Sequence, residues 1–539
     1  MKLYPKLSII VFLAFSVSAL AQNANLKENW SADNGDGTYT NPIIHADFSD
    51  PDVVRVEDDY YMTASSFNCV PGLPILHSKD LVNWELVNYA LQEQVPVEVF
   101  NTPQHGNGVW APCIRFHKGE YYIFYPDPDF GIYMVKTDDP TKEWSEPILI
   151  KGGKGLIDPT PLWDDDGKAY LAYAFAGSRA QIKTMLMVCS MMQDATATMK
   201  DDVMVFDGHD DHNTIEGPKF YKRNGYYYLF APAGGVSTGW QLALRSKNVL
   251  GPYEAKIVME QGDTPINGPH QGAWIDTPSG EDWFIHFQDK GAYGRIVHLQ
   301  PMKWEKDWPI IGEDQGNGLG FPVDTYKKPD LKSDDSIKGM VYNDEFNSTD
   351  LGLQWQWHAN PSLYWGFPTP YGYFKMYCKP MPEEAKSLWD IPHLLMQKWP
   401  AESFTATTKI NFAAREDGER VGFLIMGRSY AYLQLSREDS TLYASQVICE
   451  RADQGGKEVE GKRIKLDSGD QYLKIKVSPG GKCDFFISQD GKSYSQIGTT
   501  FTAMEGKWIG AKIGFVALRD GITNDSGSMD IDYIRFTKN

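Results

Sequence analysis

Three carboxylic acids, a tryptophan and a histidine stand beside prolines at widely separated points of this 539-residue chain. They occur as Asp50-Pro51, Trp110-Ala111-Pro112, Asp158-Pro159, Glu216-Gly217-Pro218 and Pro269-His270. An Asp before Pro is often only a turn former, and a lone His is more often structural than catalytic. What sets these five apart is that each lies about 11 to 13 residues ahead of a similar aromatic strand.

Two carboxyl groups facing each other across a glycosidic bond can hydrolyse it. One, protonated, donates to the leaving oxygen, and the other, ionised, activates a water on the opposite face of the sugar when the reaction inverts configuration. A third carboxylate can raise the pKa of the acid through like-charge repulsion. Asp50, Asp158 and Glu216 have the residue types for such a trio.

The five aromatic strands form a repeat that could position these residues. Each follows a Gly or Asp turn, and successive anchors lie roughly 50–60 residues apart, a spacing typical of propeller blades. The anchors are Tyr61, Tyr122, Tyr170, Tyr228 and Trp283. We therefore expect a five-bladed β-propeller over residues 22–326, whose innermost strands bring the five residues to one end of a central channel.

The pattern changes after residues 327–339, a charged and turn-rich segment that we expect to be a linker. Short alternating strands follow, such as "SFTATTKINF" and "MDIDYIRFT", without a second set of carboxylates in phase. Residues 340–539 are therefore predicted to form a two-sheet β-sandwich, which makes the whole chain an all-β protein.

The first residues resemble a secretory signal peptide. Lys2 and Lys6 precede an apolar run, residues 7–20, that is too short to span a bilayer comfortably, and Ala19-Leu20-Ala21 forms a small-x-small cleavage site. We expect residues 1–21 to be removed and the protein to be exported, with the periplasm as the preferred compartment and secretion as the alternative.

The acidic composition narrows the range of partners. The net charge of −19 disfavours nucleic acid and anionic membranes, so a neutral substrate is expected. The 13 % aromatic content suits stacking against sugar rings, although β-rich proteins also use aromatic residues in their cores. Six scattered cysteines show no zinc spacing, and most of them are predicted to be buried apolar residues.

Five stretches in order along the chain resemble glycoside hydrolase family 43: "NPIIHADFSDPDVVRVEDDYYMTASSF", "GVWAPCIRFHKGEYYIFY", "GLIDPTPLWDDDGKAYLAY", "IEGPKFYKRNGYYYLF" and "NGPHQGAWIDT". The resemblance implies a five-bladed propeller of an inverting enzyme. It implies that Asp50 is the general base, Asp158 the modulator of the acid's pKa, and Glu216 the general acid.

The same resemblance assigns further residues around the sugar. His270 matches the axial histidine of the family, which in some members lies near a bound calcium or sodium ion, and no cofactor is otherwise required. Arg295 resembles the arginine that holds the sugar, while Phe67 and Trp110 resemble the aromatic walls of its pocket. Trp240 and Gln288 are further candidates for substrate binding that could equally be structural.

The C-terminal segment resembles the concanavalin-like domain of family 43 β-xylosidases and α-L-arabinofuranosidases. A sandwich of this type can pack on the propeller and narrow the active-site mouth, which favours exo action; the alternatives are stabilisation alone or lectin-like binding. We expect an exo-acting α-L-arabinofuranosidase on plant hemicellulose or pectin side chains. Arabinose is preferred over xylose because the stretch "VSTGWQLALRS" departs from the pattern of dedicated xylosidases. The alternatives are a β-D-xylosidase, a non-catalytic glycan-binding protein, and a retaining fructan-cleaving propeller.

Overall fold

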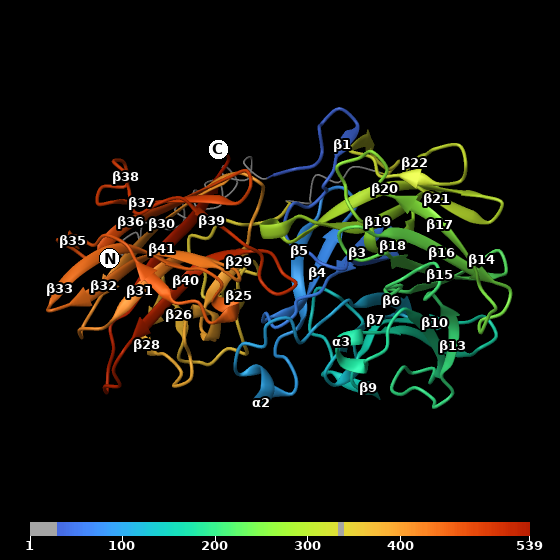
Figure 1. Ribbon diagram of the computed structural model, residues 1–539, viewed down its shortest axis with the longest axis horizontal. Coiled ribbons are helices and arrows are strands. Elements are labelled where there is room, and N and C mark those ends of the chain that lie inside the picture. The colour runs from blue at the N-terminus through green and yellow to red at the C-terminus, as the bar shows by residue number, and fades with distance from the viewer. Residues whose placement is uncertain (1–29, 332–338) are drawn as a thin grey trace, which may run out of the picture.

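The computed structural model describes residues 30–331 and 339–539, which form two β-rich domains side by side (Figure 1). The blue to yellow strands are a five-bladed propeller, and the orange to red strands are a two-sheet sandwich, so the predicted fold class is confirmed. The predicted signal peptide, residues 1–21, lies outside the described residues, as does most of the predicted linker, residues 327–339.

Each blade is a four-stranded antiparallel sheet whose strands follow chain order. Blade one contains β2 (Asp52–Val56), β3 (Asp59–Thr63), β4 (Gly72–Ser78) and β5 (Glu85–Leu91). Blade two contains β6 (Cys113–His117), β7 (Glu120–Asp127), β8 (Gly131–Thr137) and β9 (Ile148–Gly152). Blade three contains β10 (Leu156–Trp163), β11 (Ala169–Phe175), β12 (Met185–Met191) and β13 (Val203–Asp207).

The last two blades repeat this arrangement. Blade four contains β14 (Lys219–Arg223), β15 (Tyr226–Ala233), β16 (Trp240–Ser246) and β17 (Glu254–Glu260), extended by β23 (Gly320–Phe321) and β22 (Glu313–Asp314). Blade five contains β18 (His270–Asp276), β19 (Asp282–Asp289), β20 (Arg295–Glu305) and β21 (Trp308–Ile311). Short helices α2 (Val97–Phe100) and α3 (Gly177–Ala180) and the 3-10 turn η2 (Gly291–Tyr293) lie in the connections.

The turns that marked the repeat in the sequence join the first and second strands of the blades. Lys118-Gly119 and Asn224-Gly225 are two-residue loops in which both residues have positive φ, the type I′ geometry that matches strand twist. Gly relieves the steric cost of that conformation at the second position. All five aromatic anchors accordingly lie in the second strand of their blade.

The two ends of the propeller are joined by backbone pairing. Strand β1 (Thr38–Thr40) pairs antiparallel with β24 (Thr325–Lys327), and Ile44 forms a bridge with Val297 of β20. The segment that enters blade one thus runs along blade five, which brings residues about 250 positions apart in sequence into contact. This closure places the start of blade one beside the start of β20.

A buried polar layer lies one step along the channel from the candidate catalytic residues. Asp52 has no exposed surface and accepts hydrogen bonds from the Ile114 amide at 2.6 Å and from Arg115 at 2.7 Å. Lys219 is 2 % exposed, lies 3.5 Å from the other Asp52 oxygen and donates to the Pro112 carbonyl. Because buried charges are costly unless they are paired, this network ties blades one, two and four together.

The sandwich consists of two sheets. One contains β25 (Gln356–Trp357), β29 (Leu395–Lys398), β40 (Lys512–Arg519), β31 (Arg420–Met426), β32 (Tyr430–Glu438), β33 (Thr441–Cys449), β34 (Glu458–Glu460), β28 (Lys379–Pro380) and β35 (Ile464–Leu466). The other contains β26 (Gly366–Pro368), β27 (Phe374–Tyr377), β41 (Ser528–Thr537), β30 (Phe404–Ala413), β36 (Asp470–Ser478), β37 (Lys482–Ser488), β38 (Ser495–Gln496) and β39 (Phe501–Thr502). The 3-10 turns η3 (Leu388–Asp390) and η4 (Ala452–Gln454) connect strands.

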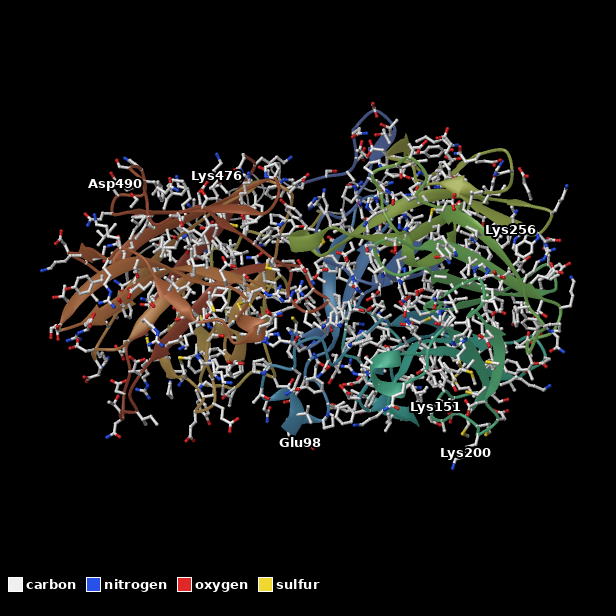
Figure 2. All side chains as sticks on the ribbon, in the orientation of Figure 1. Glu98, Lys151, Lys200, Lys256, Lys476 and Asp490 are labelled. Atoms are coloured by element: carbon white, nitrogen blue, oxygen red, sulfur yellow. The ribbon has the colours of Figure 1, made fainter. Side chains whose placement is uncertain are left out.

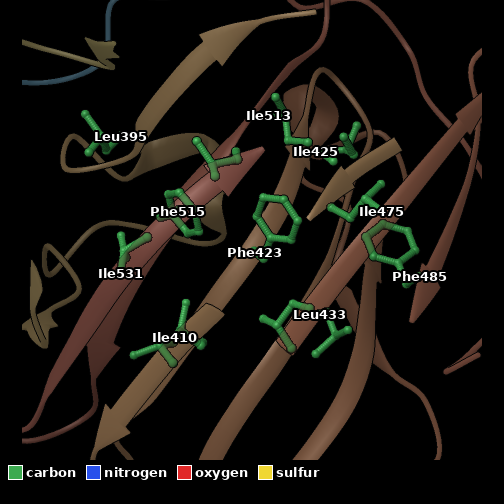
Figure 3. Close-up of a cluster of buried hydrophobic side chains, with 14 of the residues drawn as sticks. Leu395, Ile410, Phe423, Ile425, Leu433, Ile475, Phe485, Ile513, Phe515 and Ile531 are labelled. Carbon is green, nitrogen blue, oxygen red and sulfur yellow. The ribbon is translucent and has the colours of Figure 1, made fainter. Parts of the chain in front are cut away.

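Alternating residues explain why these strands form a sandwich. In β30 every second residue from Phe404 to Phe412 is buried, because successive side chains of a strand point to opposite faces. Phe423, Phe515 and Ile475 meet between the sheets in the core shown in Figure 3. Each fully buried side chain of this size contributes about 1.5–3 kcal/mol relative to an exposed one.

The two domains share hydrogen bonds as well as apolar contacts. The amide and carbonyl of Val70 both pair with Trp357, and the Asn360 amide donates to the Phe100 carbonyl.

Charged side chains such as Glu98, Lys200 and Asp490 project from the rims of the molecule (Figure 2). Over residues 30–331 and 339–539, the helices are all too short or too polar to cross a membrane.

All six cysteines are buried and unbridged, whereas the sequence predicted burial for most of them. Burial raises the pKa of the Cys113 thiol to about 12, which leaves it a packing residue of the channel rather than a nucleophile.

Candidate active site

Two of the predicted catalytic residues occupy one repeated backbone position at the start of the blades. Asp50, two residues before the start of β2, and Asp158, inside β10, both have φ of 56°, and each precedes a proline. Asp tolerates this left-handed conformation better than most residues. Gly217 in blade four and Gln271 in blade five have φ of 59° and 44° at the same position, so the left-handed turn recurs at the mouth of the channel.

Glu216, Trp110 and His270 lie one residue before that repeated position. The amide of Trp110 donates to the Pro126 carbonyl and that of Glu216 to the Pro232 carbonyl, which fixes their place beside the second strand of each blade. The sequence predicted that all five residues occupy equivalent positions in their blades. That prediction is wrong for these three, which lie one residue earlier than Asp50 and Asp158. The number of residues between each of them and its aromatic anchor also depends on the length of the loop between the first two strands. A count along the sequence therefore does not distinguish a longer loop from a shift in strand register.

The structure nevertheless gathers most of the predicted residues around one pocket with a volume of about 300 Å³. Of the nine candidates, these seven line it: Asp50, Phe67, Trp110, Asp158, Glu216, His270 and Arg295. They come from all five blades, so the pocket exists only when the propeller is closed.

Asp50 is held by three donors. Its Oδ2 accepts hydrogen bonds of 2.6 Å from both Ser49 Oγ and Ser65 Oγ, and Arg295 Nη1 lies 3.3 Å from each carboxylate oxygen. The Asp50 side chain is 6 % exposed, so these contacts fix its orientation in a mostly desolvated environment. A carboxylate oriented in this way is suited to accept a proton from a water in the pocket.

Asp158 and Glu216 form a carboxyl pair. Asp158 Oδ2 accepts from the Gly217 amide at 2.8 Å and Oδ1 from Gln271 Nε2 at 3.1 Å. Burial, and next the charge of Glu216, raise the pKa of Asp158 well above its ordinary value. Because like charges in a buried site disfavour double ionisation, the pair retains a proton at a pH where isolated carboxyls would both be ionised.

The two members of this pair differ in access to the pocket. Asp158 is 3 % exposed, whereas the Glu216 side chain is 29 % exposed and its Oε1 lies 3.1 Å from His270 Nε2. A Cβ on Gly217 would lie 2.3 Å from Gln271 Oε1, so blades four and five approach each other closely at this glycine. The accessible member, Glu216, is the one that can reach a bound substrate.

Arg295 and three aromatic rings, those of Phe67, Trp110 and Trp508, form the walls of the pocket. The Arg295 guanidinium lies 4.8 Å above the Phe287 ring and 5.6 Å from that of Trp508, and its Nη1 donates to Ser49 at 2.8 Å. The Trp110 ring lies 6.4 Å from Phe67 and 6.3 Å from Trp508, edge-on in both cases. A cation beside apolar faces is an arrangement that can orient a neutral, hydroxylated ring.

Sequence reasoning missed Trp508, which the sandwich contributes to the pocket from the loop between β39 and β40. Trp508 has φ of 65°, and a Cβ on Gly106 of the propeller would come within 2.4 Å of Lys507 and 3.0 Å of Trp508. The only sequence signal is a tryptophan between glycines in "EGKWIGAK", which does not reveal its partner domain. Ser49, Ser65 and Gln271 were missed as well, since they act on the carboxylates rather than resembling catalytic groups.

Two predicted substrate-binding residues do not line the pocket. Trp240 opens β16 and packs over Gly234, where an added Cβ would lie 2.5 Å from its ring. Gln288 is engaged at both ends of its amide, donating to the Pro265 carbonyl at 2.8 Å and facing His298 Nε2 at 3.0 Å. Gln288 is therefore engaged by hydrogen bonds within the protein, and Trp240 packs against the turn at Gly234.

His270 lies beside one carboxylate, that of Glu216. Its Nε2 faces Glu216, and its Nδ1 is buried with no hydrogen-bond partner. Calcium takes six to eight oxygen ligands, and within residues 30–331 and 339–539 no group of three or more His, Cys, Asp or Glu side chains could hold a metal.

Comparison with known proteins agrees with this architecture. The family described as Glycosyl hydrolases family 43 matches residues 39–309, and Beta xylosidase C-terminal Concanavalin A-like domain matches residues 343–537. A putative beta-xylosidase of Xylanibacter ruminicola is 38 % identical, covering 89 % of this chain and 86 % of its own. The non-reducing end alpha-L-arabinofuranosidase BoGH43B of Bacteroides ovatus is 28 % identical, covering 72 % and 73 %. A solved structure described as Bacteroides ovatus Xyloglucan PUL GH43B has a TM-score of 0.81 and 25 % identity, covering 93 % and 100 %.

Proposed function

The chain belongs to glycosyl hydrolases family 43, and from that premise we propose that it is an exo-acting, inverting hydrolase that releases single terminal pentoses. The observation that carries the proposal is the convergence of Asp50, Asp158 and Glu216 on one pocket that Trp508 of the sandwich helps to close. A pocket walled by the second domain accepts the end of a glycan more readily than its middle.

Asp50 and Glu216 divide the chemistry. Asp50 takes a proton from a water molecule as the water oxygen bonds to the anomeric carbon. The bond from that carbon to the leaving oxygen breaks, and the proton of Glu216 passes to the leaving oxygen. The products are a free pentose of inverted configuration and a shortened glycan, with Asp50 protonated and Glu216 ionised until solvent restores both.

Asp158 sets the protonation state of the pair. It is buried behind Glu216 and is fixed by Gly217 and Gln271, so it does not need to touch the substrate. Because the two carboxyls disfavour each other's ionisation, the pair holds a proton that Glu216 can donate to the leaving oxygen. Arg295 contacts Asp50 directly and can hold sugar hydroxyls beside the attacking water.

We place β-D-xylose first among the pentoses and α-L-arabinofuranose second. The 38 % identical relative carries the name putative beta-xylosidase and is matched over nearly its full length, whereas the arabinofuranosidase is 28 % identical. The expected preference for arabinose rested on "VSTGWQLALRS", and of that stretch Val236 lines the pocket while Trp240 does not. α-L-arabinofuranose remains the second candidate because a 28 % identical relative is named a non-reducing end alpha-L-arabinofuranosidase.

The natural substrates that suit this proposal are plant oligosaccharides or polysaccharide side chains bearing terminal xylose or arabinose. Export directed by residues 1–21 would bring the enzyme to such polymers, in the periplasm first and outside the cell second. The acidic charge continues to disfavour nucleic acid and anionic membranes as partners.

The test compares hydrolysis of aryl β-D-xylopyranoside and aryl α-L-arabinofuranoside by the wild type and by Asp50→Asn. We expect the wild type to prefer the xyloside and Asp50→Asn to lose activity on both substrates, and NMR of the fresh product should show inverted anomeric configuration. A preference for the arabinoside would promote the second candidate and keep the mechanism. Retained configuration, or activity on neither substrate, would refute the proposed mechanism.

A further inference from the structure

Asp47 joins the two domains at the edge of the pocket. Its side chain is nearly buried, at 5 % exposure, in the segment that enters blade one. Oδ1 accepts a hydrogen bond of 2.8 Å from the Arg295 amide, and Oδ2 accepts one of 2.9 Å from the Gly510 amide. One carboxylate therefore contacts the backbone of the pocket arginine and the backbone of the sandwich loop at the same time.

Both contacts lead directly to pocket residues. Arg295 opens β20 and sends its side chain to Ser49 and Asp50, while Gly510 lies two residues after Trp508. The Arg295 guanidinium and the Trp508 ring then meet in the pocket at 5.6 Å. The Asp47 carboxylate thus connects two walls of the pocket. It binds the backbone of Arg295 on one side and that of Gly510, in the Trp508 loop, on the other, and so sets the spacing between them.

The junction around Asp47 has no room for a different geometry. A Cβ on Gly294 would lie 2.4 Å from Asp47 Oδ1, and a Cβ on Gly510 would lie 2.8 Å from the Gly294 nitrogen. The amide of Ala511 also donates to the Ala292 carbonyl at 2.7 Å, so the loop runs tightly along the turn that precedes β20. A displacement of either strand end would therefore be transmitted to the other.

We infer that Asp47 is a positioning residue that fixes Arg295 and the Trp508 loop relative to each other, so that the sandwich acts as a wall of the sugar-binding pocket. The inference rests on the proposed function for its kinetic consequence, but its structural part, the clamp on Gly510, stands independently of catalysis. Hydrogen bonds to an ionised acceptor are the stronger kind, which suits a carboxylate to hold two amides at once.

The first experiment is Asp47→Asn, which keeps one acceptor oxygen and presents an NH₂ group to the second amide. We expect KM for the aryl pentoside to rise at least tenfold and kcat/KM to fall by about 10²-fold, the effect of a misplacement of about 1 Å. Loss of folded protein alone would lower the apparent kcat and leave KM unchanged, so a rise in KM separates positioning from stability.

The matched control is Glu402→Gln, which removes the same charge from another interdomain contact, the 3.4 Å pair with Lys290. It should keep the wild-type KM, because Glu402 does not contact Arg295 or Gly510. An Asp47→Asn variant whose KM equals that of Glu402→Gln would overturn the inference. If Asp47→Asn does not fold, Gly510→Ala perturbs the same contact from the sandwich side and must raise KM in the same way. An unchanged KM in Gly510→Ala would overturn the inference equally.

A double-mutant cycle and hydrogen exchange complete the test. If Asp47 acts through Trp508, then Trp508→Ala should cost less in kcat/KM when combined with Asp47→Asn than it does in the wild type. Backbone exchange over residues 505–511 should be faster in Asp47→Asn than in Glu402→Gln. If the wild type hydrolyses neither aryl glycoside, the proposed function fails; the exchange measurement still decides the clamp, and equal exchange rates in the two variants would refute it.

Discussion

Removal of the Glu216 carboxyl by Glu216→Ala should separate substrates by the acidity of their leaving groups. Proton donation to the leaving oxygen contributes about 10²–10⁴ in rate, or roughly 3–5 kcal/mol of barrier. A sugar or a phenol needs that proton, whereas a dinitrophenolate departs without it. The loss in kcat/KM should therefore approach 10³–10⁴ for poor leaving groups and remain within about tenfold for the most acidic ones.

The structure indicates why no neighbour should replace Glu216. Asp158 is 3 % exposed, and both of its oxygens already accept hydrogen bonds, from Gly217 and Gln271. His270 Nε2 faces the Glu216 carboxyl at 3.1 Å but is itself buried. The variant also removes the Glu216 charge, the second-largest cause of the raised pKa of Asp158, so that pKa should fall. Activity of the wild type should decline as pH rises and the pair loses its shared proton, and this alkaline decline should disappear in the variant.

The assay is a series of aryl glycosides from dinitrophenyl to phenyl, measured as kcat/KM for the wild type, Glu216→Ala and the near-isosteric Glu216→Gln. The wild type should show a shallow dependence on leaving-group pKa, and both variants a steep one. Asp50→Asn is the matched control, because loss of the base should lower the rate for every leaving group alike. An equal loss across the series in Glu216→Ala would refute its assignment as the acid.

Three further predictions follow from particular residues. Burial raises the pKa of Asp127 to about 7 from 3.8, so its ionisation progressively destabilises the folded protein between about pH 4 and pH 7. Asp127→Asn should therefore raise the free energy of unfolding by up to about 4 kcal/mol at pH 8 and by nothing at pH 4, as measured by thermal unfolding at both pH values. Trp508→Ala should lower kcat/KM about tenfold with little change in melting temperature, because it removes one pocket wall and the Trp508 side chain is 42 % exposed. An unchanged KM would exclude Trp508 from the sugar site. Lys219→Met should cost about 3–5 kcal/mol of unfolding free energy in denaturant titrations, because it removes one cationic partner of the buried Asp52 carboxylate, and a neutral result would mean that Arg115 alone compensates that charge.

The sequence alone determined the architecture and most of the pocket, because both depend on patterns that repeat. A Gly or Asp turn precedes an aromatic strand in each blade, as at Gly119 and Gly225, and blade geometry then requires the first strands to meet at one axis. Alternation in segments such as 404–413 likewise specified the sandwich. Motif resemblance added residues such as Arg295, which carries no periodic signal of its own.

Tertiary structure alone decided the contacts between parts that share no pattern. Register within a blade placed Glu216 one residue away from the position of Asp50 and Asp158, a difference that depends on loop length rather than on residue type. Trp508 and Asp47 became pocket and junction residues only through the packing of one domain on the other, about 460 positions apart in sequence. A local pattern reports which face of a strand is buried, whereas the partner that buries it is chosen by the whole fold, and that is why the sequence could not supply this half of the site.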